Sequence, residues 1–340
     1  MLSAKDALHK LLDRVDLTRE EMLSVMHQIM CGEYTPVQIA GVLIALRMKG
    51  ETVDEIAAAA EVMRALSTKV EAAADAHLID TCGTGGDGIQ TFNVSTVSAF
   101  VAAAAGAKVA KHGGRSVSST CGSADVLEAL GVNVNLSPAQ VANSVNEAGI
   151  GFMFAPNHHS AMKHAAPVRR ELGVRTLFNL LGPLTNPAGA PNQVMGVFDR
   201  ALTAKLAHVL KQLGSRHVLV VHGADGMDEI SFSGDTYVAE LKDGEVREYV
   251  LNPAQFGMAL HPVSSIRVEN AEQSKAVILD VLAGKAGPAR DIVLLNAGAA
   301  IYVAGQAVSL QAGIARAAEV IDSGAAHAKL TQLVEFSARS

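Results

Sequence analysis

The 340-residue sequence contains few cysteines, and none is spaced like a metal-binding or redox motif. Cys31, Cys82 and Cys121 form an odd set without a C-x-x-C pair, which predicts free thiols in a reducing compartment and no catalytic cysteine. Positive charge is also scarce, because 28 Lys and Arg stand against 34 Asp and Glu. A chain with net charge −6 has no overall attraction for nucleic acid or anionic lipid, so functional basic residues must be concentrated locally.

Long apolar runs are missing as well. The N-terminal stretch MLSAKDALHK lacks the apolar core of a signal peptide, and polar side chains interrupt the longest uncharged window, residues 88–107. We therefore expect a cytoplasmic protein without a membrane-spanning helix. With 49% hydrophobic and 18% charged residues, the chain is typical of globular proteins, and its length favours two domains.

Residues 1–72 predict a small α-helical domain. Thr18 with Glu21 and Thr52 with Glu55 fit the capping box, which satisfies free backbone N–H groups at a helix start. Residues 36–49 should form a further helix that begins at the Thr35–Pro36 pair and ends at Gly50. Its apolar residues cover most of the surface, so we expect burial on several sides, within the domain or in a subunit interface; they are Val42, Leu43, Ile44, Leu46 and Met48.

Residues 73–340 predict a larger α/β domain with a mainly parallel sheet. Strands are expected near 77–80, 107–112, 193–198 and 216–223, alternating with helices such as one from about 95 to 105. A strand pair should follow around the turn at 242–244, and helices should fill 271–283, 289–303 and 308–322. A helical piece near 159–171 and the GPLTNP loop at 182–187 are expected to return to the helical domain.

The glycine loop DTCGTGGDGIQTFNVST at 80–96 spells G-x-G-x-x-G, the pattern of a dinucleotide-binding turn. That motif should lead directly into a helix and be followed about 20 residues later by an acidic residue, yet GIQTFN intervenes and Lys108 and Lys111 occupy the later region. The loop is therefore a phosphate-binding candidate and not a nicotinamide site. Asp87 fits an anion-binding loop only if a metal ion or a sugar hydroxyl is also present.

Two further loops carry charge. Residues 111–125, KHGGRSVSSTCGSAD, concentrate Lys111, His112, Arg115 and several serines, which suits a phosphate-rich ligand. Residues 223–231, GADGMDEIS, place Asp228 and Glu229 after an apolar strand, and adjacent carboxylates of this kind are natural Mg²⁺ ligands beside phosphates. The group His158, His159 and His164 matches no zinc motif, so these residues are expected to cap a helix or line a pocket.

These motifs together resemble the bacterial anthranilate phosphoribosyltransferase family. The resemblance rests on D-x-x-G-T-G-G-D with T-F-N-V-S-T, K-H-G-x-R-S-V-S-S-x-x-G-S-A-D, R-x-L-G-x-R-T-x-F-N-L-L-G-P-L-x-N-P and the late D-E pair, and it spans essentially the whole chain. It implies a fold shared with nucleoside phosphorylases, usually as a homodimer through the helical domain. It also implies transfer of a phosphoribosyl group from phosphoribosyl pyrophosphate to the amino group of anthranilate, with Mg²⁺, in tryptophan biosynthesis.

The resemblance also implies residue roles. Contacts to phosphoribosyl pyrophosphate are expected from Gly83, Gly86, Asp87, Thr91, Asn93, Val94, Ser95, Thr96, Lys111, His112, Gly113, Gly114, Arg115, Ser116, Val117, Ser118, Ser119 and Ser123. Mg²⁺ would be held by Ser95, Asp228 and Glu229, and anthranilate would be bound by Gly83, Gly114 and Arg169. Catalysis would depend on Lys111, Arg115, Asp228 and Glu229.

One position departs from the pattern, because the family reads K-H-G-N-R where this chain has Gly114. Losing one hydrogen bond to anthranilate would cost about 0.5–1.5 kcal/mol. The mechanism implied needs no general base, although His112 is a candidate proton acceptor. Two alternatives remain open from the sequence: a pyrimidine-nucleoside phosphorylase on the same fold, and a non-catalytic homologue that binds nucleic acid.

Overall fold

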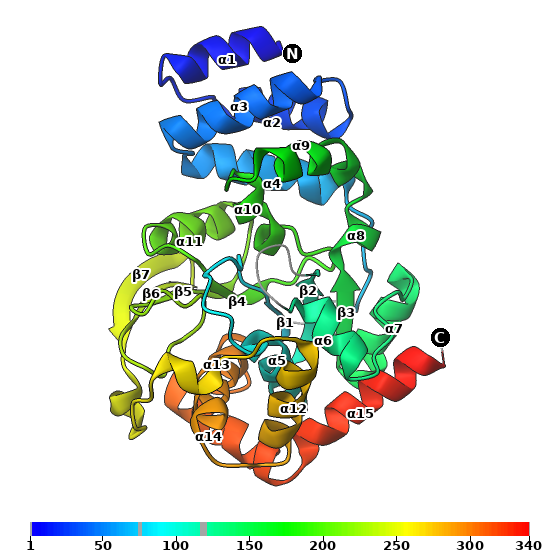
Figure 1. Cartoon of the computed structure of the whole chain (residues 1–340), viewed down its shortest axis with the longest axis vertical. Coiled ribbons are helices and arrows are strands. Elements are labelled where there is room, and N and C mark those ends of the chain that lie inside the picture. The colour runs from blue at the N-terminus through cyan, green and yellow to red at the C-terminus, as the bar shows by residue number, and fades with distance from the viewer. Residues whose placement is uncertain (1, 74–76, 116–120, 340) are drawn as a thin grey trace.

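The computed structural model describes residues 2–73, 77–115 and 121–339. A group of helices forms one end of the elongated molecule, and a larger part built on a sheet forms the other (Figure 1). Among the described helices, none combines the length and hydropathy needed to cross a bilayer.

The helical end contains α1 (Ala4–Leu12), α2 (Arg19–Met30), α3 (Pro36–Lys49) and α4 (Val53–Leu66). The predicted capping boxes at Thr18 and Thr52 are both formed, and Thr35 makes a third with Gln38. Gly50 ends α3 at a φ of 89°, as predicted from its position. Side-chain capping thus sets where each of these three helices begins.

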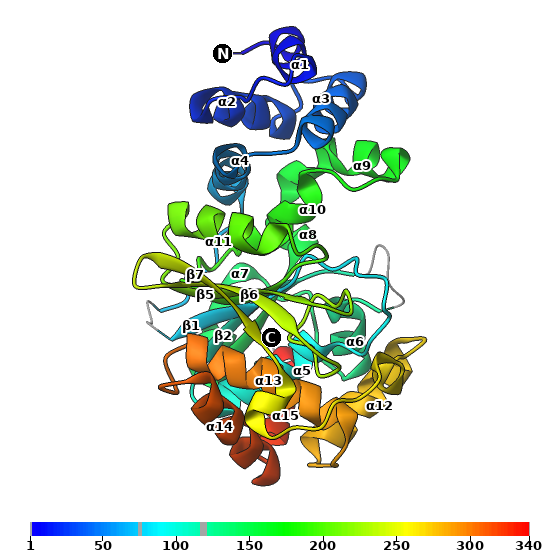
Figure 2. The ribbon, with the colours of Figure 1, turned by 90° about the vertical axis from the view of Figure 1, so that its left-hand side faces the viewer.

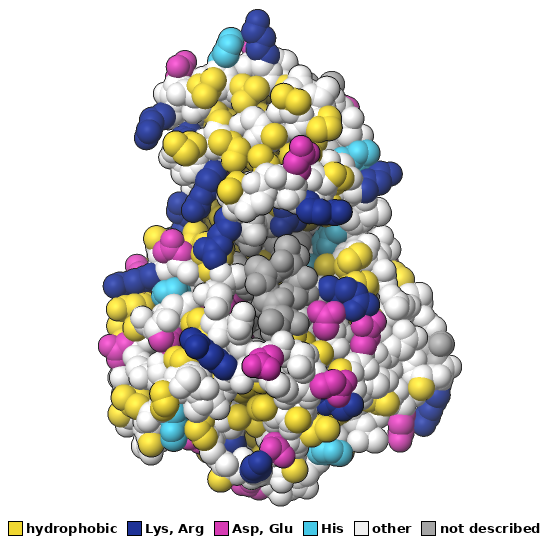
Figure 3. All heavy atoms as spheres, in the orientation of Figure 1, with side chains coloured by type: hydrophobic (Ala, Val, Ile, Leu, Met, Phe, Trp, Pro, Cys, Tyr) yellow, Lys and Arg dark blue, Asp and Glu magenta, His cyan; other side chains and the backbone are white. Residues whose placement is uncertain are grey.

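Within a single chain, the predicted burial of α3 is seen for part of the helix. Val42, Leu43 and Leu46 are buried, but Met48 is 71% exposed and Val37, on the same helix, is 82% exposed. Hydrophobic side chains gather on the surface of this end of the molecule (Figure 3). The helix therefore buries one side and leaves apolar side chains at the surface.

One seven-stranded sheet forms the centre of the larger part. Its strands are β1 (Leu78–Thr81), β2 (Lys108–Gly113), β3 (Ile150–Phe154), β4 (Asn192–Gly196), β5 (His217–Gly223), β6 (Thr236–Lys242) and β7 (Glu245–Leu251). They lie in the order β3-β2-β1-β4-β5-β6-β7, with β1 to β5 parallel and the last two antiparallel. The predicted mainly parallel sheet and the predicted strand pair are confirmed.

Helices cover both faces of the sheet (Figure 2). Those with the main contacts to the strands are α5 (Val94–Ala104), α7 (Pro138–Ala148), α11 (Leu202–Gln212), α13 (Pro288–Val303) and α15 (Ala325–Ala338). The helices α6 (Ser123–Ala129), α12 (Ala271–Leu282) and α14 (Leu310–Asp322) pack mainly against other helices. Alternate residues of β5 enter different cores: Val218 and Val220 join the core of the helical end, and Leu219 and Val221 join the core under α5 and α13. The helical end and one sheet face thus share a continuous apolar core.

A segment of short helices leads from the sheet to the helical end and back. It comprises α8 (Ala155–His158), the 3₁₀ helix η1 (Ser160–His164), α9 (Ala166–Leu172), α10 (Phe178–Leu181) and the 3₁₀ helix η2 (Gly182–Leu184). Ala165, Val168 and Leu177 of this segment are buried in the same core as α2, α3 and α4. The division of the chain at residues 72 and 73 stays a prediction.

The sheet topology defines where a ligand is expected. The chain leaves β1 toward β2 on one side and later returns to β4 on the other, so the strand order reverses at β1. Ligands of open parallel sheets bind at the carboxyl ends of the strands beside such a reversal. The predicted loops follow β1, β2 and β5, whose carboxyl ends lie at this edge.

Candidate active site

The first glycine loop, residues 82–93, leaves β1 beside the end of β4. The backbone N–H of Thr84 donates to the carbonyl of Gly196 at 2.9 Å. Gly85, Gly86 and Gly88 have φ values of 64°, 79° and 75°, in the left-handed region that glycine tolerates best. The loop leads into the first turn of α5, which supplies Val94, Ser95 and Thr96.

Asn93 connects this loop to its neighbours. Its side-chain amide donates to the carbonyl of Cys121 at 3.2 Å, and its Oδ1 accepts from the hydroxyl of Ser274 at 2.8 Å. Thr91 forms an isolated antiparallel bridge with Arg267. Two residues predicted to contact the substrate therefore also hold the loop in place.

The third loop, after β5, lies directly against the first. Asp228 Oδ2 accepts from the backbone N–H of Gly85 at 2.8 Å. A side chain at Gly196 would place Cβ 1.5 Å from the carbonyl oxygen of Asp228, so glycine is required where β4 ends. Asp225, the other acid of this loop, accepts from the Ser231 hydroxyl at 2.6 Å and the Met227 N–H at 3.0 Å, which gives it a structural role.

Three carboxyl groups meet between the two loops. Burial, and then the charge of Asp87, raise the pKa of Asp228 to about 7. Burial and the charge of Asp228 raise the pKa of Glu229 well above its usual value, while Lys111 partly opposes this rise. Since buried like charges disfavour ionisation, this cluster is electrostatically suited to a cation.

Lys111 and Ser95 lie beside the acidic cluster. The buried Lys111 ammonium donates to the hydroxyl of Ser95 at 3.1 Å and to the carbonyl of Thr81. The Thr81 hydroxyl donates to the carbonyl of Ser95 at 3.1 Å. The structure thus brings together Ser95, Lys111, Asp228 and Glu229, which the sequence analysis selected from three separate loops.

A buried polar network at Asp80 supports this arrangement and was missed from the sequence. Asp80 accepts from the backbone N–H of His112 at 3.1 Å and from the side-chain amide of Asn186 at 2.7 Å. Asn186 also donates to the carbonyl of Ala110 at 2.9 Å. Burial raises the pKa of Asp80 to about 6. This network ties β1, β2 and the 182–187 loop together under the site.

The structure describes the two ends of the second loop, residues 111–115 and 121–125. Ser116, Val117, Ser118 and Ser119 lie outside the described residues. Ser123 begins α6, and its hydroxyl packs so closely on Gly113 that a Cβ there would lie 2.2 Å from it. A Cβ at Gly114, in contrast, would have no atom of the described residues within 4 Å.

Arg115 lies on the side of the loop next to α6. Its guanidinium donates to Asp125 at 2.8 Å and makes a two-pronged pair with Glu128 at 2.7 and 2.8 Å. The structure therefore places this side chain with two acids of α6 and not with Asp228 and Glu229.

Two arginines of the returning segment, Arg175 and Arg169, differ in their contacts. Arg175 donates to the carbonyl of Gly86 and stacks over the ring of Phe198 at 4.0 Å, an arrangement that the sequence analysis did not predict. Arg169 lies over Phe178 at 5.4 Å, and burial lowers its pKa. In the part of the chain that the structure describes, the Arg169 guanidinium has no carboxylate or carbonyl partner.

The predicted histidine group separates into three environments. His158 Nδ1 lies 3.0 Å from the carbonyl of Thr68, and His164 packs against Gly32. The ring of His159 lies 5.1 Å from that of His112. Within the described ranges, the buried Nε2 atoms of His112, His158 and His159 have no hydrogen-bond partner.

Comparisons with known proteins agree with this geometry. Residues 75–327 match the model of the glycosyl transferase family, a/b domain, and residues 5–67 match that of the glycosyl transferase family, helical bundle domain. An anthranilate phosphoribosyltransferase from Methylobacillus flagellatus is 71% identical over 99% of this chain and 98% of the relative.

Solved structures show the same relationship. The crystal structure of anthranilate phosphoribosyltransferase from Thermus thermophilus is 45% identical, with a TM-score of 0.93 over 98% of this chain and 100% of that chain. The Saccharomyces cerevisiae enzyme, in complex with phosphoribosyl pyrophosphate and Mg, is 29% identical, with a TM-score of 0.83 over 100% of this chain and 94% of that chain. These matches favour neither the phosphorylase nor the nucleic-acid-binding alternative. The chain belongs to the anthranilate phosphoribosyltransferases of the glycosyl transferase family.

Proposed function

We propose that the three loops bind phosphoribosyl pyrophosphate with Mg²⁺ and that the chain transfers the 5-phosphoribosyl group to the amino group of anthranilate. The products are N-(5-phosphoribosyl)anthranilate and pyrophosphate, a step of tryptophan biosynthesis. The observation that carries this proposal is the meeting of Asp228, Glu229, Ser95 and Lys111 at the carboxyl ends of β1, β2 and β5. The yeast relative, bound to the same donor and Mg, supports it.

Donor binding would use both glycine-rich loops. The backbone N–H groups of Gly83, Gly86 and the start of α5 suit phosphate oxygens, because a helix start carries partial positive charge. Lys111 adds a full positive charge, and Ser123 adds a hydroxyl donor. Arg115 would contribute from the far side of the second loop, where its present partners are acids of α6.

The residues present fit Mg²⁺. Two half-buried carboxylates and the Ser95 hydroxyl are hard oxygen donors, the ligand type that Mg²⁺ prefers. Burial and the repulsion among the carboxylates raise the pKa of both acids, which Lys111 only partly opposes at Glu229. Asp228, Glu229 and Ser95 would hold the ion. When bound, it would neutralise charge on the departing pyrophosphate.

Anthranilate would be oriented by Arg169 through its carboxylate. A guanidinium that is half-buried and without an anion in the described residues is suited to a bidentate carboxylate contact. Gly83 and Gly114 would leave room for the aromatic ring. Holding the amine in line with the sugar carbon supplies much of the rate, because an aromatic amine is a weak nucleophile.

Proton removal needs no strong base. After attack, the nitrogen carries positive charge and loses its proton readily. His112 is neutral, since burial and then the neighbouring His159 lower its pKa to about 3. Its Nδ1 lies 3.2 Å from the carbonyl of Gly182, which assigns the proton to Nδ1 and leaves the Nε2 lone pair as an acceptor.

Two further properties belong to this proposal. Exposed apolar side chains on α1 and α3, including Leu12 at 69% and Val37 at 82%, support a homodimer formed through the helical end. Three free cysteines support a cytoplasmic location. Light scattering on wild type and Val37→Glu tests the first: a dimeric wild type and a monomeric variant are expected, and a monomeric wild type contradicts the dimer.

The activity is tested by measuring pyrophosphate release from phosphoribosyl pyrophosphate. Release should require both Mg²⁺ and anthranilate. The phosphorylase alternative predicts instead that inorganic phosphate releases the base from thymidine or uridine. Base release without anthranilate-dependent pyrophosphate formation would overturn the proposed function.

A further inference from the structure

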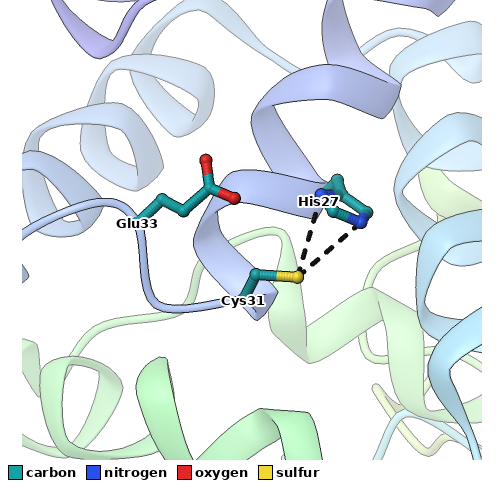
Figure 4. Close-up of side chains that lie close together, drawn as sticks. All are labelled: His27, Cys31 and Glu33. Carbon is teal, nitrogen blue, oxygen red and sulfur yellow. Dashed lines mark hydrogen bonds between the residues drawn. The ribbon is translucent and has the colours of Figure 1, made fainter.

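A second group of metal-ligating side chains lies in the helical end, at the last turn of α2. His27, Cys31 and Glu33 offer a ring nitrogen, a sulfur and a carboxylate oxygen that all lie within 4.8 Å of one another. All three residues are exposed. Figure 4 shows Cys31 next to His27 and the Glu33 carboxylate extending back toward the helix. None of them belongs to the loops described above.

Helix geometry aligns the first two ligands. His27 and Cys31 are four residues apart, so their side chains lie on the same face of α2. The Cys31 sulfur is 3.7 Å from both nitrogens of the His27 ring. A pair at this spacing on one helix is a common metal-binding arrangement, because the backbone already holds both donors in place.

The turn after α2 brings the third ligand back. Gly32 has a φ of 77°, and its N–H donates to the carbonyl of Ile29 at 3.1 Å. The N–H of Glu33 donates to the carbonyl of Gln28 at 2.9 Å. These two bonds form a Schellman motif, which reverses the chain at a helix end. Glu33 is thereby held beside the last turn instead of continuing away from it.

Packing fixes this turn further. A side chain at Gly32 would place Cβ 2.6 Å from the ring of His164, so the returning segment contacts the turn closely. The position of Glu33 is therefore set by backbone hydrogen bonds on one side and by a packed imidazole on the other. A site with a preset backbone loses less conformational entropy when it binds an ion.

The local electrostatics favour a cation. The C-terminal end of a helix carries partial negative charge from its aligned peptide dipoles, and Glu33 adds a full charge there. Among the residues that the structure describes, no Lys or Arg forms an ion pair with Glu33. Within those residues, the Glu33 carboxylate is therefore not paired with a basic side chain of the protein.

We propose that His27, Cys31 and Glu33 bind a divalent cation of the Zn²⁺ class. Nitrogen, sulfur and oxygen donors together suit Zn²⁺ and Co²⁺, whereas Mg²⁺ prefers oxygen alone. Three protein ligands leave the fourth tetrahedral position for water. The thiol gives up its proton when the metal binds, so binding weakens as the pH falls.

The test is titration of the full-length protein with Co²⁺ in excess Mg²⁺, followed by the near-ultraviolet thiolate-to-cobalt absorption band. Wild type should bind one Co²⁺ per chain with this band, and Zn²⁺ should displace it. Cys31→Ser should abolish the band, and His27→Ala and Glu33→Gln should each weaken binding by about tenfold or more. Cys82→Ser is the matched control and should leave the band unchanged.

Two results would overturn the proposal. One is a wild-type titration without a thiolate band. The other is a band that survives Cys31→Ser and disappears in Cys82→Ser, which would place the ion near Asp80 and His112 instead. Cys31→Ser is expected to fold and to keep its turnover with Mg²⁺, since Cys31 is exposed and lies outside the proposed active site.

Discussion

Replacing Asp228 with asparagine should stabilise the metal-free protein at pH 8 while it lowers turnover. The Asp228 side chain accepts from the N–H of Gly85 and shares a hydrogen bond with Asp87. Asparagine keeps both contacts, because its oxygen accepts from Gly85 and its amide donates to the Asp87 carboxylate. The substitution thus removes a half-buried charge without removing its hydrogen bonds.

The magnitude follows from the pKa. Burial and Asp87 raise the pKa of Asp228 from 3.8 to about 7. An acid with a raised native pKa contributes stability below its unfolded pKa, and this contribution is lost as the pH rises through about 7. The full pKa shift of Asp228 corresponds to roughly 4 kcal/mol of lost stability. Because Glu229 shares the repulsion, we expect the free energy of unfolding of the variant to exceed that of wild type by roughly 1–3 kcal/mol at pH 8.

Urea unfolding in EDTA measures this difference. The advantage of Asp228→Asn should shrink by up to about 1.4 kcal/mol for each pH unit below 7. Glu248→Gln, at an exposed acid, is the control and should change stability by less than about 0.5 kcal/mol. A variant less stable than wild type at pH 8 would refute the reasoning. With Glu229→Gln added, turnover should fall sharply, and an unchanged kcat at saturating Mg²⁺ would contradict the metal assignment.

Three more predictions concern the acceptor and the buried histidines. Arg169→Ala should raise KM for anthranilate about tenfold to a hundredfold, because a charge-assisted contact is lost. KM for the donor should change little, and the exposed control Arg170→Ala should change neither value. Equal effects of Arg169→Ala on both KM values would remove Arg169 from the acceptor site. Gly114→Asn, whose Cβ meets no described atom within 4 Å, should lower KM for anthranilate by the equivalent of about 0.5–1.5 kcal/mol, and a raised KM would contradict this prediction. Burial lowers the pKa of His112 to about 3 and that of His159 to about 4. Below pH 6.5 the unfolded chain protonates these two histidines before the folded protein does. The free energy of unfolding should therefore fall on acidification by up to about 1.4 kcal/mol per pH unit for each histidine. His159→Asn should flatten this dependence in urea unfolding between pH 7 and 5, and an unchanged slope would argue against it.

Much of the fold was predictable because it rests on local signals. Capping boxes at Thr18 and Thr52 defined helix starts, and the turn between β6 and β7 uses Asp243 and Gly244, both with positive φ. Other elements gave no such signal. The strand Ile150–Phe154 is a short apolar run, and only Ser323 and Gly324 separate α14 from α15, so neither element was predicted. Their identity depends on what packs against them.

The site was predictable where a loop carries its own chemistry and unpredictable where distant segments meet. Lys111, at the end of an apolar strand, and Asp228 and Glu229, after another, were selected from their charge. Asp80 and Asn186 are 106 residues apart in sequence, and Arg175 and Gly86 are 89 apart, so their contacts exist only in the fold. The orientation of the Arg115 side chain was also not predicted from the sequence, because Asp125 and Glu128 on α6 compete with any phosphate for its guanidinium.

The most direct test of the central claim is loss of anthranilate fluorescence when the purified protein is mixed with phosphoribosyl pyrophosphate and Mg²⁺. We expect wild type to consume anthranilate in step with pyrophosphate release, and Asp228→Asn with Glu229→Gln to do so far more slowly. No loss of fluorescence with wild type, and none with Gly114→Asn, would contradict the account.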